Sequence, residues 1–196
     1  MQESLTREEN QQRELSATKH KAYTDPLTGV KSKTAYLEVT ESYKCHMIAG
    51  DALEFATVVF DVNDLKRVND VEGHEAGDRH IISACGMICD VFKHSPIFRI
   101  GGDEFVSILE GKDYRNRDTL MLAFNQLVGE NLRNGRVVVS AGMSDFDPKA
   151  DKTYNSVFQR ADEAMYQRKR SSKAAGMSDS APLNFTRRRK KLLPFP

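Results

Sequence analysis

The sequence has no tryptophan, only three cysteines and almost no excess of one charge. The cysteines are Cys45, Cys85 and Cys89, and no further cysteine or histidine cluster completes a zinc-type spacing around them. We therefore expect free, buried thiols in a reducing cytoplasm, and neither a disulfide framework nor a structural zinc site. The formal net charge of +1 also provides no electrostatic attraction for nucleic acid or for an anionic membrane.

Long hydrophobic runs are missing as well. No stretch approaches the roughly 18 continuous apolar residues of a transmembrane helix, and no signal-peptide pattern opens the chain. We therefore expect no membrane contact within this chain and a cytoplasmic location. With 196 residues and 39% hydrophobic content, the chain suits one globular domain with an ordinary core, plus extensions.

Both ends differ in composition from the middle of the chain. Residues 2–21 are polar, contain neither glycine nor proline, and have sparse apolar positions such as Leu5 and Leu15, which favours an exposed helical stalk. After Lys173 the composition changes to Ser, Ala, Gly and Pro and ends in TRRRKKLLPFP, which favours a flexible basic tail. We therefore predict a stalk over residues 1–22, one folded domain over 23–175 and a tail over 176–196.

Hydrophobic periodicity predicts the elements of the folded domain. Strands are expected at residues 55–62, 97–100, 104–109 and 136–141, where apolar and β-branched residues gather. Helices are expected at residues 31–48, 78–92, 117–132 and 154–169, with a short helical stretch from residue 64 and a glycine-bearing loop over 70–78. This order predicts an α+β fold, in which helices pack against a mainly antiparallel sheet of the palm or ferredoxin-like type.

The predicted hairpin at residues 97–109 has an unusual centre, because the sequence GGDE at residues 101–104 interrupts its apolar run. The two glycines let a phosphate or sugar approach the backbone closely. Asp61 lies near the end of a buried strand, so pairing of the hairpin beside that strand brings Asp61 and Asp103 together. Two converging carboxylates repel each other unless a cation such as Mg²⁺ lies between them. A plain hairpin with exposed acids at its turn is the alternative.

A second polar segment, FDVNDLKRVNDVEGHEAGD, includes the end of that buried strand. The helix start at Asn63 to Lys66 has free backbone N–H groups, which favour anions, and Lys66 adds a positive charge for phosphate oxygens. Asn69 and Asp78 are polar residues next to glycine-rich backbone, although each alone is typical of a turn or a helix cap. These features add phosphate chemistry to the acids of the hairpin.

Five segments, in order, resemble the successive motifs of the GGDEF family. They are DPLTG at 25–29, the polar segment at 60–78, RIGGDEF at 99–105, SAG at 140–142 and ADEAMYQRK at 161–169. The resemblance covers about residues 22–175. Members of that family are diguanylate cyclases, so the resemblance implies an enzyme that condenses two GTP into cyclic di-GMP and releases two pyrophosphates.

The resemblance also implies a metal-dependent site. Mg²⁺, with Mn²⁺ as a substitute, is expected to be held by Asp61, Asp103 and the backbone carbonyl of Val62. The metal neutralises charge while the 3′-hydroxyl of one GTP attacks the α-phosphate of the other. Glu104 is expected to assist deprotonation of that hydroxyl, and Lys66 to act with Asp103 and Glu104 as a catalytic residue.

Contacts to GTP follow from the same resemblance. Asn69 and Asp78 are expected to bind guanine, since a carboxylate can accept from the N1–H and 2-amino groups, a donor pattern that adenine does not offer. The other substrate-binding residues are expected to be Asn63, Gly101, Gly102, Lys169 and Lys173, with the two lysines at the phosphates. Each site holds one nucleotide, so the active unit is expected to be a homodimer. The stalk implies an upstream sensor domain outside this chain.

Three positions depart from the family pattern. Asn63 stands where many members have an acid, and Lys173 stands where an arginine is usual, which keeps the charge but loses the bidentate fork. The RxxD product-inhibition motif is replaced by FKHS at residues 92–95, so we expect no feedback inhibition there. Two alternatives stay open: a GTP-binding regulatory domain with weak or no turnover, and a cyclase of relaxed specificity that makes mixed cyclic dinucleotides.

Overall fold

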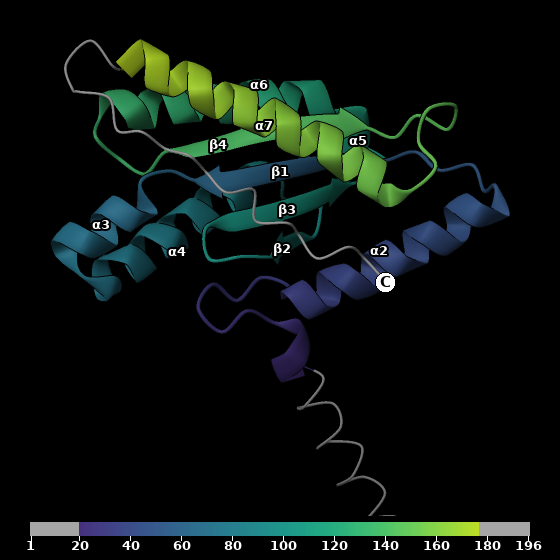
Figure 1. The fold of residues 1–196 in the computed structure, drawn as a ribbon, viewed down its shortest axis with the longest axis horizontal. Coiled ribbons are helices and arrows are strands. Elements are labelled where there is room, and N and C mark those ends of the chain that lie inside the picture. Colours follow the sequence, from purple (N-terminus) through teal and green to yellow (C-terminus); the bar gives the residue numbers. More distant parts are fainter. Residues whose placement is uncertain (1–19, 177–196) are drawn as a thin grey trace, which may run out of the picture.

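The computed structural model describes residues 20–176, with side chains to residue 171. In this part of the chain, four strands form an antiparallel sheet in the spatial order β2-β3-β1-β4 (Figure 1). The strands are β1 (Ala56–Val62), β2 (Ile97–Arg99), β3 (Glu104–Leu109) and β4 (Val139–Asp145). The predicted α+β fold with an antiparallel sheet is confirmed.

Helices cover both faces of the sheet (Figure 1). The helices are α2 (Lys33–Ala49), α3 (Leu65–Glu72), α4 (His74–Val91), α5 (Gly111–Arg115), α6 (Arg117–Arg133) and α7 (Tyr154–Gly176). Buried residues of α2 and α7 share one hydrophobic cluster, and buried residues of α4 and α6 form a second cluster on the opposite face. No helix within the described residues is long and apolar enough to span a bilayer.

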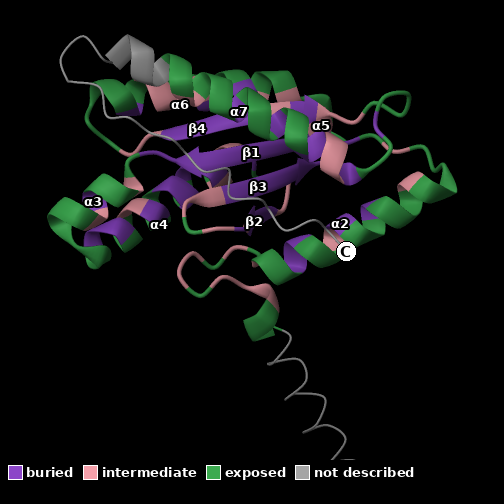
Figure 2. Cartoon of the chain, viewed as in Figure 1, coloured by how far each residue is buried: buried purple, intermediate pink, exposed green. Residues whose placement is uncertain are grey.

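Strand β1 is buried along its whole length because both faces of the sheet are covered (Figure 2). Successive side chains of a strand point to opposite faces. Phe60 and Val62 accordingly belong to the cluster with α4 and α6, whereas Val59 belongs to the cluster with α2 and α7. Asp61 therefore points to the face that α2 and α7 cover, a position that becomes important for the site.

Most predicted elements are confirmed to within a few residues. The strand predicted at 55–62 is β1, the hairpin is the antiparallel pair β2–β3, and the helix predicted at 117–132 is α6. Residues 1–19 and 177–196, which hold most of the predicted stalk and basic tail, lie outside the described residues. The division of the chain into stalk, domain and tail stays a prediction.

The expectation of a loop over residues 70–78 is wrong. Helix α3 continues to Glu72, and α4 begins at His74, so the single residue Gly73 joins the two helices. Gly73 has φ of 85°, a conformation that glycine adopts without steric cost, and one such residue suffices to redirect the chain. Asp78 consequently lies inside α4 and is not its N-cap.

Two smaller differences concern the second half of the chain. β4 begins at Val139 rather than at residue 136, because its extent follows its pairing with β1, in which every residue of β1 has a β4 partner. The five-residue helix α5 is absent from the predicted elements, since a single turn of helix is too short to show a hydrophobic period.

Helix α7 packs directly on the backbone of β4 at Gly142. A Cβ atom at this position would lie 2.1 Å from the amide nitrogen of Met165 and 2.3 Å from the carbonyl oxygen of Ala161. Both atoms belong to the α7 backbone, so the whole helix would have to move to admit a side chain. Gly142 therefore sets the distance between α7 and the sheet.

We expect Gly142→Ala to lower the free energy of unfolding by about 1–3 kcal/mol, the usual cost of forcing extra volume into a well-packed core. Gly86→Ala is the matched control, because Gly86 is exposed inside α4 and nothing lies within 4 Å of an added Cβ. Higher helix propensity should raise its free energy of unfolding by about 0.5–1 kcal/mol. Urea titration followed by circular dichroism measures both changes, and an unchanged Gly142→Ala variant would contradict the close approach of α7.

Candidate active site

Asp61 lies near the end of β1 with no exposed surface. In the register of the sheet it stands directly opposite Glu104 on β3 and Ser140 on β4. Directly opposed residues of antiparallel strands point to the same face of the sheet. Two acids and a hydroxyl group therefore gather at one end of the sheet, on the α2–α7 face.

Asp103 joins this end of the sheet through the backbone. The amide of Val62 donates to the carbonyl oxygen of Asp103 at 2.8 Å, which continues the β1–β3 pairing one step beyond Glu104. The Asp103 side chain is half-buried. The structure thus brings together Asp61, Val62, Asp103 and Glu104, the residues that the sequence assigned to the metal and the attacking hydroxyl.

An ion pair between Lys169 Nζ and Asp61 Oδ1 links α7 to β1. The Asp61 side chain is fully buried and the Lys169 side chain is 16% exposed, so solvent and salt screen this pair only weakly. The sequence predicted a phosphate contact for Lys169, and the structure places its ammonium group at the carboxylate expected to hold the metal. Lys173 lies one turn further along α7, where the side chains are outside the described residues.

The two glycines of the hairpin turn have different roles. Neither has a positive φ, so the turn does not depend on glycine conformations that other residues avoid. A Cβ on Gly101 would lie 2.5 Å from a carboxylate oxygen of Glu104, so the absent side chain leaves room for this acid. Around Gly102, which is exposed, nothing lies within 4 Å of an added Cβ. Only the open space at Gly102 agrees with the expected close approach of a ligand to the backbone.

Arg99 is a site residue that the sequence reasoning missed. Its guanidinium group donates to both carboxylate oxygens of Asp25, at 3.1 and 3.2 Å, and to the carbonyl oxygen of Gly102 at 2.9 Å. It therefore ties the 25–29 loop to the turn of the hairpin. Arg99 and Asp25 are 74 residues apart in the sequence, so no local spacing reveals the contact. The available signal was that both residues belong to segments that resemble the family motifs.

The carboxylate of Asp25 also accepts from the amide and the hydroxyl group of Thr28, at 2.9 and 2.7 Å. Burial opposes its ionisation, but these hydrogen bonds and the ion pair with Arg99 outweigh burial and lower the pKa of Asp25. Because the pKa is lower in the folded state, this group stabilises the fold above the ordinary pKa of an aspartate. That contribution is lost as the pH falls through the lowered value.

Helices α3 and α4 bring together the two residues predicted to bind guanine. Asn69 on α3 packs against Gly77 on α4, where an added Cβ would lie 1.8 Å from the side-chain oxygen of Asn69. Asp78 follows Gly77 directly and is exposed, as is Lys66 in the first turn of α3. An amide, a carboxylate and an ammonium group thus belong to one helix pair next to the end of β1.

Asn63 forms the corner between β1 and α3. Its side-chain oxygen accepts from Ser140 Oγ at 3.0 Å, and its backbone carbonyl oxygen lies 3.0 Å from His80 Nε2. Asp64 follows with φ of 59°, the one positive φ of a non-glycine residue in the described part of the chain. The sequence predicted a substrate contact for Asn63, whereas its side-chain oxygen holds this corner to β4.

The donor atoms at this end of the sheet suit a hard divalent cation. Asp61 and Asp103 carry carboxylates and Val62 a backbone carbonyl, and oxygen ligands are those that Mg²⁺ prefers. Within the described residues, no three or more His, Cys, Asp or Glu side chains form a group that could hold a metal ion. A cation held here would therefore need backbone and phosphate oxygens in addition to the two carboxylates. Mg²⁺ is commonly bound in this way, through one or two carboxylates plus substrate phosphates.

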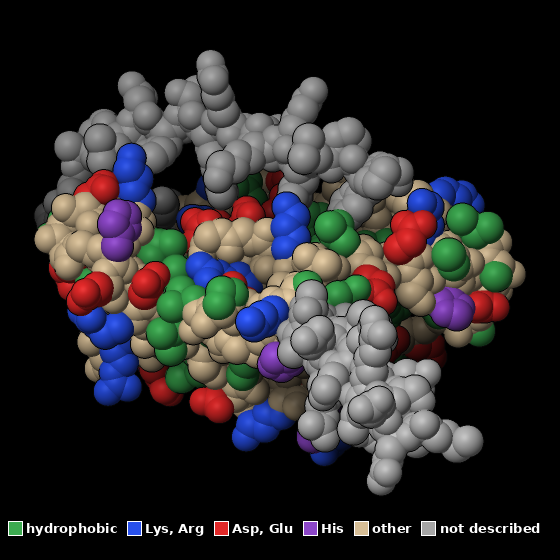
Figure 3. All heavy atoms as spheres, turned by 90° about the horizontal axis from the view of Figure 1, so that it is seen from below, with side chains coloured by type: hydrophobic (Ala, Val, Ile, Leu, Met, Phe, Trp, Pro, Cys, Tyr) green, Lys and Arg blue, Asp and Glu red, His purple; other side chains and the backbone are tan. Residues whose placement is uncertain are grey.

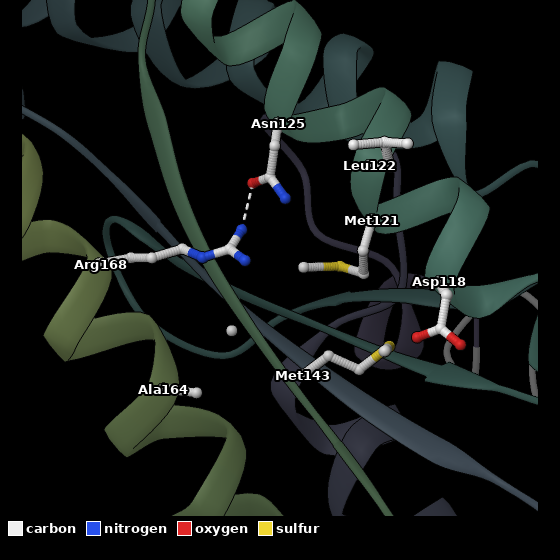
Figure 4. A pocket seen from close by; sticks show the side chains of 8 residues that line it. Asp118, Met121, Leu122, Asn125, Met143, Ala164 and Arg168 are labelled. Carbon is white, nitrogen blue, oxygen red and sulfur yellow. Dashed lines mark hydrogen bonds between the residues drawn. The ribbon is translucent and has the colours of Figure 1, made fainter.

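A cavity of about 350 Å³ lies elsewhere, between α6, β4 and α7 (Figure 4). Asp118 and Arg168 are among the residues that line it, and Arg168 donates to the side-chain oxygen of Asn125 (Figure 4). None of the residues predicted for the site lines this cavity. The candidate active site is instead the end of the sheet beside α3 and α4, where Asp61, Asp103 and Glu104 gather.

The segment at residues 92–95, where the inhibition motif would stand, is anchored in the interior by Phe92, whereas Lys93 and His94 are exposed. Phe92 is 1% exposed and packs edge-on against Phe60. The amide of His94 and the hydroxyl group of Ser95 both donate to the buried carboxylate of Asp113, at 3.1 and 2.8 Å. This segment connects α4 to β2, is hydrogen-bonded to α5 through Asp113, and contains neither the arginine nor the aspartate of an RxxD motif.

The sequence matches the family model described as diguanylate cyclase, GGDEF domain, over residues 22–175. Diguanylate cyclase DgcP of Pseudomonas aeruginosa is 31% identical to this chain over 170 residues, which cover 81% of this chain and 24% of DgcP. The chain therefore spans about a quarter of the length of this relative.

Solved structures share the fold. The coiled coil and GGDEF domain of DgcB from Caulobacter crescentus, in complex with c-di-GMP, has a TM-score of 0.71 at 24% identity, over 86% of this chain and 92% of that chain. Diguanylate cyclase SiaD from Pseudomonas aeruginosa, in complex with its activator SiaC, has a TM-score of 0.64 at 25% identity. That match covers 86% of this chain and 66% of the SiaD chain.

We expect Lys169→Met to lower the free energy of unfolding by about 2–4 kcal/mol in metal-free buffer, because it leaves the buried Asp61 carboxylate without its lysine. Lys169→Arg, which keeps the charge, is the control and should lose less. Added Mg²⁺ should restore part of the loss in Lys169→Met, since a cation at Asp61 replaces the missing charge. Urea titration with and without Mg²⁺ measures both effects, and equal stability of the two variants would show that the ion pair contributes little.

Proposed function

Because the chain belongs to the GGDEF family, we propose that it is a diguanylate cyclase, which condenses two GTP into cyclic di-GMP and releases two pyrophosphates. The observation that carries the proposal is the gathering of Asp61, Asp103 and Glu104 at one end of the sheet. Metal-dependent nucleotidyl transfer uses carboxylates for the metal and a group that accepts the proton of the attacking hydroxyl. The chain spans 24% of the length of DgcP, so the proposal concerns the domain within this chain.

We assign guanine to the α3–α4 pair and the triphosphate to the end of the sheet. The Asp78 carboxylate accepts from guanine N1–H and the 2-amino group, and the Asn69 amide supplies a donor and an acceptor beside it. The first N–H groups of α3 have no partner within the helix and favour phosphate oxygens, to which Lys66 adds its charge. Lys169 supplies a second ammonium group on the sheet side.

In the reaction, the 3′-oxygen of one GTP forms a bond to the α-phosphorus of the other, and the bond from that phosphorus to the pyrophosphate oxygen breaks. When bound by Asp61, Asp103 and the Val62 carbonyl, Mg²⁺ supplies charge neutralisation at the triphosphate. Glu104 accepts the proton of the 3′-hydroxyl. Lys66 stabilises the negative charge of the leaving pyrophosphate, which makes the departure of this group easier.

We propose a two-fold homodimer as the active unit, because one site holds one GTP and the product joins two. SiaD, a similar protein, is solved with an activator, and we propose that a sensor or partner outside this chain sets the dimer geometry. On the face seen in Figure 3, basic and acidic side chains are interspersed, which favours a small nucleotide over a nucleic-acid polymer as the ligand. Since GTP is the substrate, we place the domain in the cytoplasm.

The decisive experiment for the proposal is mass-spectrometric product analysis after incubation of concentrated protein with GTP and Mg²⁺. We expect cyclic di-GMP from the parent chain and at least a hundredfold less from Asp103→Asn, since losing one metal-binding charge removes several kcal/mol of transition-state stabilisation. Asp90→Asn, an equal change of charge at an exposed position of α4, is the control and should retain full activity.

The other outcomes separate the alternatives. A chain that binds GTP but forms no product, even when two copies are joined through a strong dimeric coiled coil, would be a regulatory GTP-binding domain. A mixed cyclic dinucleotide from a sample that also contains ATP would identify a cyclase of relaxed specificity. Removal of divalent cations with a chelator should abolish turnover in either type of cyclase.

Gly77→Ala tests the guanine site without touching a ligand-binding group. The new methyl group must displace the Asn69 side chain, so the KM for GTP should rise about tenfold, which corresponds to one lost hydrogen bond of about 1.4 kcal/mol. Gly86→Ala, nine residues further along the same helix, should leave KM unchanged. Steady-state kinetics of pyrophosphate release measure both variants. An unchanged KM in Gly77→Ala would remove Asn69 from the guanine site.

A further inference from the structure

Cys85 and Cys89 form a thiol pair on α4 that the proposed function does not use. They are four residues apart on one face of the helix, and their sulfur atoms lie 4.0 Å apart. Cys85 is buried and Cys89 is half-buried, so Cys89 is the more accessible residue of the pair. Cys45, the third cysteine, is exposed on α2 and belongs to a different helix.

The geometry of the thiol pair does not suit a disulfide. Cβ atoms at positions i and i+4 of a helix are about 5–6 Å apart, whereas a disulfide needs about 3.5–4.5 Å. The helix would have to deform to close the bond. The sulfur separation does suit one atom bonded to both sulfurs, because two bonds of about 2.3 Å at a tetrahedral angle span about 3.8 Å.

The protonation of the pair also favours reaction with a soft centre. A hydrogen bond from Cys85 lowers the pKa of Cys89 to about 7, although partial burial and Asp90 act against it, and the pKa of Cys85 is raised. Cys89, the less buried residue of the pair, is therefore partly ionised at neutral pH to the thiolate, the form that attacks electrophiles and binds soft metals. No third His, Cys, Asp or Glu completes a metal-binding group within the described residues, which disfavours zinc and its four ligands.

We propose that the thiol pair binds one soft, thiophilic centre of low coordination number across both sulfurs, with trivalent arsenic as the chemical class that fits. A monosubstituted trivalent arsenical, RAs(OH)₂, forms two As–S bonds and loses two As–O bonds. The two thiol protons leave with the hydroxyl groups as two waters, so no oxidant or reductant is needed. The bridging atom fits between the two sulfurs with little change in their separation.

A ligand bound to the thiol pair acts on the GGDE turn through the loop at residues 25–30, which includes the 25–29 loop that Arg99 ties to the turn. Leu27 and Val30 pack against the same core cluster as the two cysteines, and Thr28 lies close enough to Cys85 to influence its pKa. Thr28 in turn donates twice to Asp25, and Asp25 holds Arg99, which donates to the Gly102 carbonyl. A substituent attached to the two sulfurs displaces this loop and with it the GGDE turn. This inhibitory effect rests on the proposed cyclase function, whereas binding at the thiol pair does not.

The test uses phenylarsonous acid on the full chain with Cys45→Ser as the background, so that two thiols remain of the three. Intact-mass spectrometry should show one phenylarsenic group per chain with loss of both remaining free thiols. A dithiol such as 2,3-dimercaptopropanol should remove the group, and a monothiol at the same concentration should not. Cyclic di-GMP formation should fall at least tenfold on loading and return when the dithiol is added.

Cys89→Ser is the primary variant because its position is half-buried, and Cys85→Ala is the second because serine would be costly in the core. Circular dichroism melting establishes that each variant folds. Both should lose binding that resists monothiol while keeping basal turnover. If either variant still binds phenylarsenic in a form that resists monothiol, the proposed two-sulfur site is wrong. If the loaded parent keeps full turnover, the proposed coupling between the thiol pair and the GGDE turn is wrong. If no cyclase activity exists at all, the mass measurement still decides the binding.

Discussion

The antiparallel register of β1 and β3 is the constraint on which the rest of the site depends. It places Asp61 opposite Glu104 and continues to the bond between the Val62 amide and the Asp103 carbonyl oxygen. A slip of one residue would move Asp61 to the face of α4 and α6, among apolar side chains. Because β1 is buried on both faces, each alternating set of its side chains has its own cluster to fill. Ordinary core packing therefore maintains the geometry of the acids.

Helix α7 both packs against the sheet and supplies the positive charge that accompanies Asp61. Gly142 lets the backbone of α7 contact β4 at Met165, and one turn later Lys169 reaches the buried carboxylate of Asp61. A buried carboxylate is costly unless a cation accompanies it. The chain supplies that cation from a helix whose position is set by a missing side chain. The packing of α7 against β4 at Gly142 therefore also determines where the Lys169 charge lies relative to Asp61.

The GGDE turn is also tied to the loop that contains Asp25, which lies outside the sheet in the sequence order of the strands. Arg99 connects Gly102 to Asp25, and the loop that contains Asp25 packs against the same hydrophobic cluster as the thiol pair on α4. The proposed active site and the proposed thiol site therefore share a support, even though none of their residues is in common. A ligand that moves this support acts on catalysis without contacting the nucleotide.

The residue pattern alone was enough for the fold class, the hairpin and the convergence of Asp61 and Asp103, because these follow from strand periodicity and from the pairing of neighbouring strands. Local spacing alone left Asn69 and Asp78 as turn or cap residues, and only the resemblance to the family motifs singled them out. A single glycine with positive φ, Gly73, replaced the expected loop between their helices. Contacts between distant segments could not be derived in this way. The Arg99–Asp25 pair, the corner made by Asn63 and Ser140, and the pairing of Lys169 with Asp61 join residues 74 to 108 positions apart. Such contacts depend on how helices and loops pack on the finished sheet, and hydrophobic periods report which face of an element is buried but not which partner covers it.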